Sequence, residues 1–253
     1  MNEIYIGKAL DIGEQMLRTG GEVSRVEDTI ARLLFCYDFK KVNVFTITSQ
    51  IQITAEDNNG KVYSQFRRID RWGTDLERLE ELNQFSRDVC DGKADLIEDF
   101  VLEKKETQAR KYKAYIGAIL AAGGFTMFFG GSIADALITA VLAVIITFIK
   151  RFNLLINENV LLGDFIISVM TGFVGNILVL LGNRLQLGLH LDKILIGCIM
   201  LSIPGIAITH SVRDMLLGET ITGLLRFAES LFTAASIASG FILISFVFGG
   251  LSV

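Results

Sequence analysis

The sequence predicts a mainly α-helical membrane protein, in which a cytoplasmic α+β domain (residues 1–110) precedes a transmembrane domain of about five helices (residues 111–253). Hydrophobic residues make up 51% of the chain. The mean hydropathy is +0.48, above that of ordinary soluble domains. The charges are uneven, because 18 of the 24 basic and 21 of the 28 acidic residues precede Tyr115. Five apolar stretches follow, so we expect a charged folded domain joined to a bundle in the bilayer.

The first part of the chain has helical spacing of its apolar residues. One apolar face runs through residues 4–17 and a second through residues 23–34, which predicts two amphipathic helices that cover a partner surface. Gly20 and Gly21 separate them, as glycine does at a helix C-terminus. Ser24 and Glu27 have the spacing of a capping box, so we expect the second helix to begin at Ser24.

The spacing then changes to the alternation of strands. Residues 42–46, 51–53 and 62–66 alternate β-branched or apolar with polar residues, and the turn-forming residues 57–60 end in Asn-Gly. Helical spacing returns in residues 74–89 and 95–101, on either side of Gly92. This order of elements predicts an α+β layer.

Five apolar stretches in the second part are each near the length that crosses a bilayer. They cover residues 115–129, 133–149, 160–181, 187–208 and 224–248. The first two are short, and they could instead form a re-entrant pair whose turn is covered by protein. Glycine, alanine and serine are frequent in these stretches, which favours close helix packing.

Basic residues orient these helices. With simple alternation, one side of the membrane receives Lys104, Lys105, Arg110, Lys111, Lys113, Lys150, Arg151, Arg213 and Arg226. The other side receives Arg184 and Lys193. The start of the chain has no basic region followed by an apolar run, so we expect no signal peptide. The chain is therefore expected in the cell (inner or plasma) membrane, with a cytoplasmic N-terminus and an external C-terminus.

Polar residues inside the apolar stretches are candidates for a substrate or proton pathway, because ionisable groups are costly in a membrane. Asp135 lies near the start of the second stretch, where it either faces the pathway or sits at the interface. Glu229 is deeper, three residues after Arg226, so the two share a helix face and can pair. Pro204 and Gly205 interrupt the fourth stretch, either as a simple kink or as a substrate-binding break.

Several classes of function have no support in the sequence. The small net charge of −4 gives no basic footprint for nucleic acid, and no Walker or GxGxxG motif is present. The N-terminal domain contains no histidine, which excludes a Ser-His nucleophile there. His190 and His210 have no cysteine or carboxylate cluster near them in sequence, so we expect no metal and no cofactor. Cys36 and Cys90 are interpreted as small buried residues in a reducing compartment.

The polar motif after Gly21 has two interpretations. It consists of Glu22, Ser24, Arg25 and Glu27. Composition favours a solvated helix face with salt bridges, and the alternative is a polar functional site.

Three segments, in the right order along nearly the whole chain, resemble the threonine/serine exporter family. The first is Gly20-Gly21-Glu22-Val23-Ser24-Arg25-Val26-Glu27, with Ser24 where threonine is common in the family. The second is the turn Gly130-Gly131-Ser132-Ile133-Ala134-Asp135-Ala136. The third runs from Ile203-Pro204-Gly205 through Asp214, Gly218 and Gly223 to Arg226. Each motif alone is weakly specific, and together they are a good indication.

The resemblance implies export of small amino acids or, in some split pairs, of a dicarboxylate such as succinate, driven by the proton motive force without ATP. It implies that this chain is the larger subunit of a split exporter with a small integral-membrane partner. It marks Pro204, Gly205, Asp214, Gly223 and Arg226 as the candidate core. In the N-terminal domain it marks Glu22 and Arg25, within a motif that also includes Gly21, Ser24 and Glu27.

Two other functions are compatible with the same sequence. The chain could be a membrane-anchored sensor or regulatory subunit of a transporter, without transport activity of its own. A membrane-tethered enzyme is disfavoured, because the N-terminal domain offers no nucleophile–base pair and no metal ligands. The sequence leaves open whether the protein forms an oligomer.

Overall fold

The computed structural model describes residues 1–70, 73–101, 108–152 and 159–249. The chain divides into two compact units. One consists of Met1–Lys104 with Gly205–Ala228, and the other of Lys105–Pro204 with Glu229–Val253. Lys104, Lys105 and Val253, which entered the predicted orientation, lie outside the described residues.

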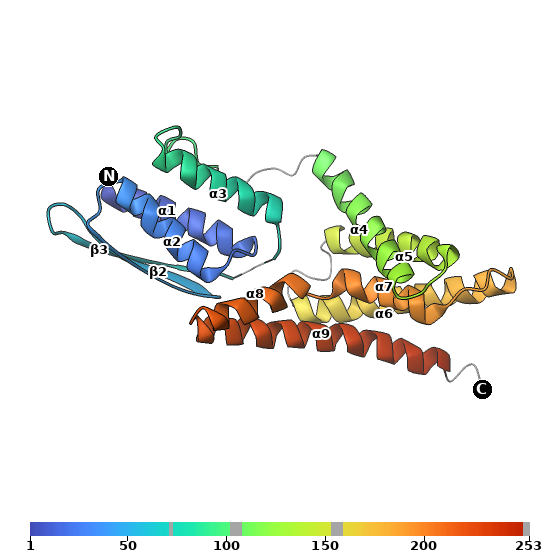
Figure 1. Ribbon diagram of the computed structural model, residues 1–253. Coiled ribbons are helices and arrows are strands. Elements are labelled where there is room, and N and C mark those ends of the chain that lie inside the picture. Colours follow the sequence, from blue (N-terminus) through green and yellow to red (C-terminus); the bar gives the residue numbers. More distant parts are fainter. Residues whose placement is uncertain (71–72, 102–107, 153–158, 250–253) are drawn as a thin grey trace. The chain divides into compact units, whose positions relative to one another are not determined.

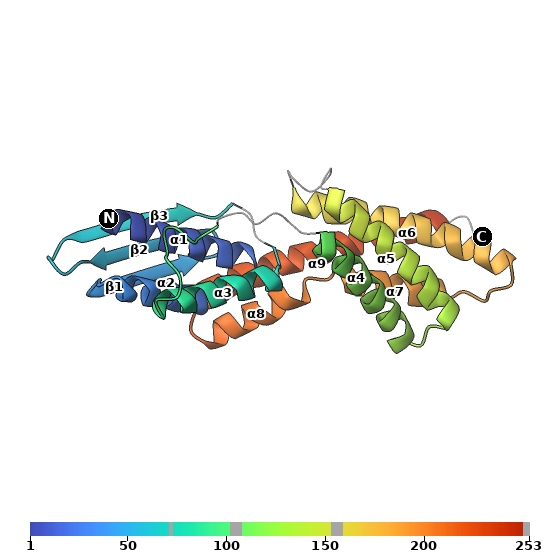
Figure 2. The same ribbon diagram turned by 90° about the horizontal axis from the view of Figure 1, so that it is seen from above.

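The first unit is built on a three-stranded antiparallel sheet with the order β1-β2-β3. Its elements are α1 (Asn2–Arg18), α2 (Val23–Cys36), β1 (Lys41–Ile47), β2 (Gln50–Glu56), β3 (Val62–Arg68) and α3 (Leu76–Cys90). Helices α1 and α2 lie against one face of the sheet (Figures 1 and 2). The β2 side chains on that face, Ile51 and Ile53, are fully buried, while Gln52 between them is exposed. The alternation predicted for this strand is confirmed.

The tight turn expected at residues 57–60 joins β2 to β3. Asp57 Oδ1 accepts hydrogen bonds from the backbone N–H groups of Asn59 and Lys61, at 2.8 and 3.0 Å. Gly60 has φ +78°, a backbone conformation that residues other than glycine rarely adopt. The Asn-Gly pair therefore forms the turn that the sequence predicts, with glycine at the position of positive φ.

Two local expectations are wrong. Helix α2 begins at Val23, with Glu22 as its N-cap, so Ser24 and Glu27 do not form a capping box. The Glu27 carboxylate instead accepts a 2.7 Å hydrogen bond from the backbone N–H of Thr46 in β1, and burial raises the pKa of Glu27. Residues 95–101 form a turn rather than a helix, because the Asp95 side chain accepts from the N–H groups of Ile97 and Glu98 and closes a local loop.

The cysteine prediction also needs correction. Cys36 is exposed and Cys90 is half-buried, so these are not small core residues. Their sulfur atoms are 2.6 Å apart and join the end of α2 to the end of α3. Burial, followed by the neighbouring Cys36 thiol, raises the pKa of Cys90 to about 12.

Two further helical segments complete the first unit. They are α8 (Gly205–Leu216) and the first turns of α9 (Thr220–Gly249). Gly218, with φ +100°, lies in the short connection between them. Gly223 allows close packing there, because a Cβ on it would lie 2.6 Å from the backbone oxygen of Ser211 and 2.9 Å from the nitrogen of Met215. The start of α9 is thus packed directly against α8.

The second unit is a helical bundle. Besides the rest of α9, it contains α4 (Gln108–Phe128), α5 (Ile133–Phe152), α6 (Val160–Arg184) and α7 (Leu191–Ser202). Small residues allow close approach: a Cβ on Gly240 of α9 would lie 2.7 Å from the Ser168 side chain of α6. The buried hydroxyls of Thr126 and Thr139 join α4 to α5 at 2.9 Å. The close packing predicted from the small residues is confirmed where Gly240 meets Ser168.

Several helices of the chain can cross a membrane. Among the described residues, Ile133–Arg151, Val160–Arg184 and Thr220–Gly249 are long and apolar enough by themselves. Helices α7 and α8, which are separated by a bend at Ile203 and Pro204, count as a fourth if they are taken together. The chain is therefore mainly helical with three or four candidate spans.

Candidate functional site

A cluster of buried charged side chains lies in the first unit. It brings together the turn between α1 and α2 and the pair formed by α8 and the start of α9. These segments contain two of the three motifs singled out in the sequence. Each motif contributes a tight glycine-dependent geometry and at least one buried charged group.

The glycine pair shapes the turn between α1 and α2. Gly20 has φ +94°, and the Gly21 N–H donates to the carbonyl oxygen of Met16 at 2.8 Å. A Cβ on Gly21 would lie 2.8 Å from that same backbone oxygen, so a larger residue cannot fit without moving the chain. The turn presents the Gly21 carbonyl oxygen and the Glu22 side chain to α8 and α9.

Arg226 of α9 makes the central contacts of the cluster. One guanidinium nitrogen lies 3.3 Å from Asp214 Oδ2 of α8, and another donates to the carbonyl oxygen of Gly21 at 2.9 Å. The side chain of Arg226 is 7% exposed and that of Asp214 is fully buried. Removing one partner of a buried ion pair is strongly destabilising, because the other charge is left buried without compensation. Arg226 therefore ties three segments of the chain together.

Glu22 makes a second ion pair beside the first. Its Oε1 lies 2.6 Å from Arg213 Nη1 and 3.9 Å from His210 Nε2. Glu22 is 8% exposed, whereas the Arg213 side chain is 58% exposed. The cluster thus reaches from buried side chains to the solvent-exposed Arg213.

Two carboxylate oxygens in the cluster have no hydrogen-bond partner in the part of the chain that the structure describes. They are Glu22 Oε2 and Asp214 Oδ1, and both atoms are buried. An unpaired buried oxygen of this kind is costly unless it binds a proton, a cation or another donor. The arrangement can therefore accept a positive charge next to the cationic Arg213 and Arg226.

The structure brings together five of the predicted site residues: Gly21, Glu22, Asp214, Gly223 and Arg226. Glu22 is buried, so the interpretation of its motif as a solvated helix face is wrong at this position. That interpretation suits Arg25, which is exposed.

The other candidates lie outside the cluster. Ser24 is half-buried in α2, and Glu27 is committed to Thr46. Pro204 lies at the bend before α8, and Gly205 is the first residue of α8. Glu229 is half-buried in α9 and belongs to the second unit, as does the fully buried Asp135 in the first turn of α5.

Two members of the cluster were not singled out from the sequence. Arg213 entered only as a basic residue that orients the membrane helices, and His210 only as a histidine without the neighbours that a metal site needs. The signal that could have identified them is helical spacing, because His210 and Asp214 are four residues apart in α8. It was missed because the fourth apolar stretch appeared to end at Ile208.

Comparison with known proteins gives one family. Residues 8–249 match the model of the family described as "Putative threonine/serine exporter". No curated protein and no solved structure matches the chain.

Proposed function

Since the chain belongs to the threonine/serine exporter family, we propose that it is a subunit of a secondary exporter for small metabolites. Membership of an exporter family and several apolar helices make it a multi-pass membrane protein, and a transporter rather than an enzyme. The proposed substrates are threonine- and serine-type amino acids, or a dicarboxylate such as succinate. The proposed energy source is the proton motive force, and the proposed partner is a small integral-membrane subunit of the same family.

The observation that supports this function best is the buried charge cluster. A free amino acid carries an ammonium and a carboxylate group. The cluster offers one oxygen each of Glu22 and Asp214 that has no hydrogen-bond partner among the described residues, and in Arg213 a guanidinium that reaches solvent. Charges of both signs at one partly dry site suit a zwitterion or a proton that accompanies it.

The same contacts support five crossings. Arg213 contacts Glu22 and Arg226 contacts Gly21, so these segments lie on one side of the membrane. A chain that leaves one side and returns to it crosses an even number of times. Helices α5 and α6 and the interrupted α7–α8 region account for three crossings, and α4 then makes the fourth.

Helix α9 would make the fifth crossing. Residues 1–110 then form the cytoplasmic domain, with α8 and the start of α9 packed against it, the other helices of residues 111–253 form the transmembrane domain, and the C-terminus lies outside. The turn before α5 and the loop before α7 face the outside in this arrangement.

Efflux from preloaded cells tests the proposal. Cells loaded with labelled serine, threonine and succinate would express this chain alone, this chain with the small membrane partner, or neither. We expect efflux of one substrate class only when both proteins are present. The protein content of the membrane fraction is the control for expression and insertion.

Two outcomes would contradict the proposal. Equal efflux with and without this chain would remove its transport role. Efflux by the partner alone, with only the response to substrate concentration changed by this chain, would instead favour a regulatory subunit.

A further inference from the structure

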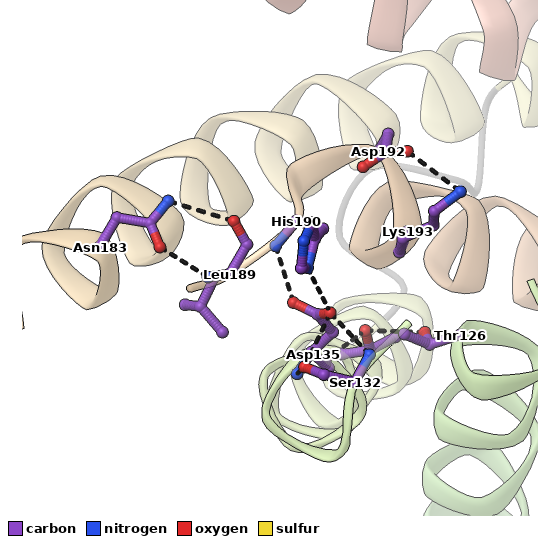
Figure 3. A network of polar contacts seen from close by, with 9 residues as sticks. Thr126, Ser132, Asp135, Asn183, Leu189, His190, Asp192 and Lys193 are labelled. Carbon is purple, nitrogen blue, oxygen red and sulfur yellow. Dashed lines mark hydrogen bonds and ion pairs between the residues drawn. The ribbon is translucent and has the colours of Figure 1, made fainter. Parts of the chain in front are cut away.

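A second polar network lies in the second unit, at the turn between α4 and α5 (Figure 3). The Ser132 N–H and hydroxyl donate to Asp135 Oδ2 at 2.8 and 2.9 Å, and the Asp135 N–H donates back to the Ser132 hydroxyl at 3.1 Å. These reciprocal bonds form a capping box at the start of α5. These bonds account for the start of α5, and the two that reach the carboxylate go to Oδ2.

His190 also contacts the Asp135 carboxylate. The His190 backbone N–H donates to Asp135 Oδ1 at 2.8 Å, and its ring Nδ1 lies 3.0 Å from Asp135 Oδ2. Asn183, near the end of α6, holds the preceding residue through two hydrogen bonds with the backbone of Leu189, at 2.6 and 3.1 Å. The loop before α7 is thereby fixed so that His190 meets the carboxylate (Figure 3).

The two partners differ in their access to solvent. The Asp135 side chain is fully buried, whereas that of His190 is 60% exposed. When Nδ1–H donates to the carboxylate, the remaining Nε2 of the ring is available to take up a proton. Uptake there converts a neutral imidazole beside a buried carboxylate into an ion pair, which strengthens the bond to Asp135.

Other charges at this end of the unit do not compensate Asp135. Asp192 and Lys193, in the first turn of α7, pair with each other at 3.3 Å. Arg184 lies in the last turn of α6 and its side chain is exposed. Helix α4 carries no charged residue after Lys113, and Glu229 is the one charged residue that α9 brings to this unit. Of the described residues, His190 is thus the one in contact with the buried carboxylate that becomes a cation when it takes up a proton.

We propose that Asp135 and His190 form a proton-binding site on the outer side of the membrane, and that protonation strengthens the contact between the α4–α5 turn and the loop before α7. The assignment to the outer side rests on the proposed function and its topology. The proton enters at Nε2 of His190 from the external medium, and the bond from Nδ1 to Asp135 carries the change in charge to the buried end of α5. An exporter driven by the proton motive force requires such a group on the side where protons enter.

Titration of the purified full-length protein tests the site without a transport assay. The two histidine rings are followed by NMR in wild type and in Asp135→Asn, with His210→Asn used to assign the signals. We expect the His190 signal to respond to pH in wild type and this response to differ in Asp135→Asn, because the opposite charge beside the ring is lost. An unchanged response, or a ring that does not titrate between about pH 5 and 8, would overturn the proposal.

Efflux measured at several external pH values tests whether the Asp135–His190 site takes part in transport. Asparagine places an amide N–H near the position of Nδ1, so His190→Asn keeps a donor to Asp135 and removes the titration. We expect wild-type efflux to rise several-fold as the external medium becomes more acidic, and His190→Asn to give efflux that no longer responds to pH. Asp192→Asn, a neighbouring acid that pairs with Lys193, serves as the matched control and should keep the wild-type profile.

The outcomes separate the two proposals. A wild-type pH profile in His190→Asn, or one that is only scaled down, would overturn the proton site and leave the exporter function standing. Absence of efflux in wild type, with the NMR titration as expected, would overturn the proposed function and leave the proton site.

Discussion

Arg226→Ala is expected to abolish efflux and to lower the stability of the first unit by about 3–5 kcal/mol, the usual cost of removing one partner of a buried pair. The substitution leaves the buried Asp214 carboxylate without its counter-ion and the Gly21 carbonyl without its donor. Asp214→Asn should also stop efflux, since it leaves the buried guanidinium uncompensated. Thermal unfolding in detergent and efflux from preloaded cells measure the two effects.

Arg226→Lys is the matched control for charge. An ammonium keeps the positive charge but lacks the fork that reaches Asp214 and Gly21 together, so we expect partial efflux and an intermediate stability. Arg226→Ala and Arg226→Lys should both appear in the membrane fraction, because the apolar helices are unchanged. Wild-type efflux from Arg226→Ala or Asp214→Asn would remove these residues from the functional site.

Gly223→Ala is expected to separate α9 from α8 and to reduce efflux severely. The added Cβ would lie 2.6 Å from the backbone oxygen of Ser211, and a backbone atom cannot move aside as a flexible side chain can. Overpacking of this kind costs about 1–3 kcal/mol, and here it also displaces Arg226, one turn along α9. Efflux and thermal unfolding are again the measurements.

Gly124→Ala is the matched substitution in another helix. A Cβ on Gly124 meets no atom within 4 Å, so this change should leave efflux intact and stabilise α4 by roughly 0.5–1 kcal/mol. Equal behaviour of the two alanine variants would contradict the close packing of α8 and α9.

Local chemistry made much of the fold predictable. The glycine pair after α1, the Asn-Gly turn and the alternation around Ile51 and Ile53 act through neighbouring residues, and all three appear as expected. The interruption at Pro204 was also evident, because proline cannot donate the backbone hydrogen bond that a continuous helix needs.

Long-range contacts explain most of the differences. Glu27 has the spacing of a capping residue, but tertiary structure assigns its carboxylate to β1. Arg213 and Glu22 are 191 positions apart, so no local pattern could join them. His190 and Asp135 are 55 positions apart, and their contact depends on how Asn183 folds the intervening loop.

The candidate site was predicted in part because the resemblance to the exporter family marked two motifs that lie far apart in the chain. The sequence suggested that Glu22 and Asp214 matter, and the structure shows that both belong to one cluster. Spacing could not reveal their proximity, nor that one oxygen of each carboxylate has no hydrogen-bond partner in the described part of the chain. Burial of Glu22 also reversed the interpretation that composition favoured for this acid.

A charge exchange between Glu22 and Arg213 tests most directly whether this cluster is the functional core. Glu22→Arg and Arg213→Glu each place like charges together at a contact that is now 2.6 Å, so each should lose efflux, whereas the double variant should recover a substantial part of it. Lys93→Glu, a reversal within an exposed ion pair, is the control and should have little effect. Full efflux from both single variants, or a double variant no better than either, would contradict the account.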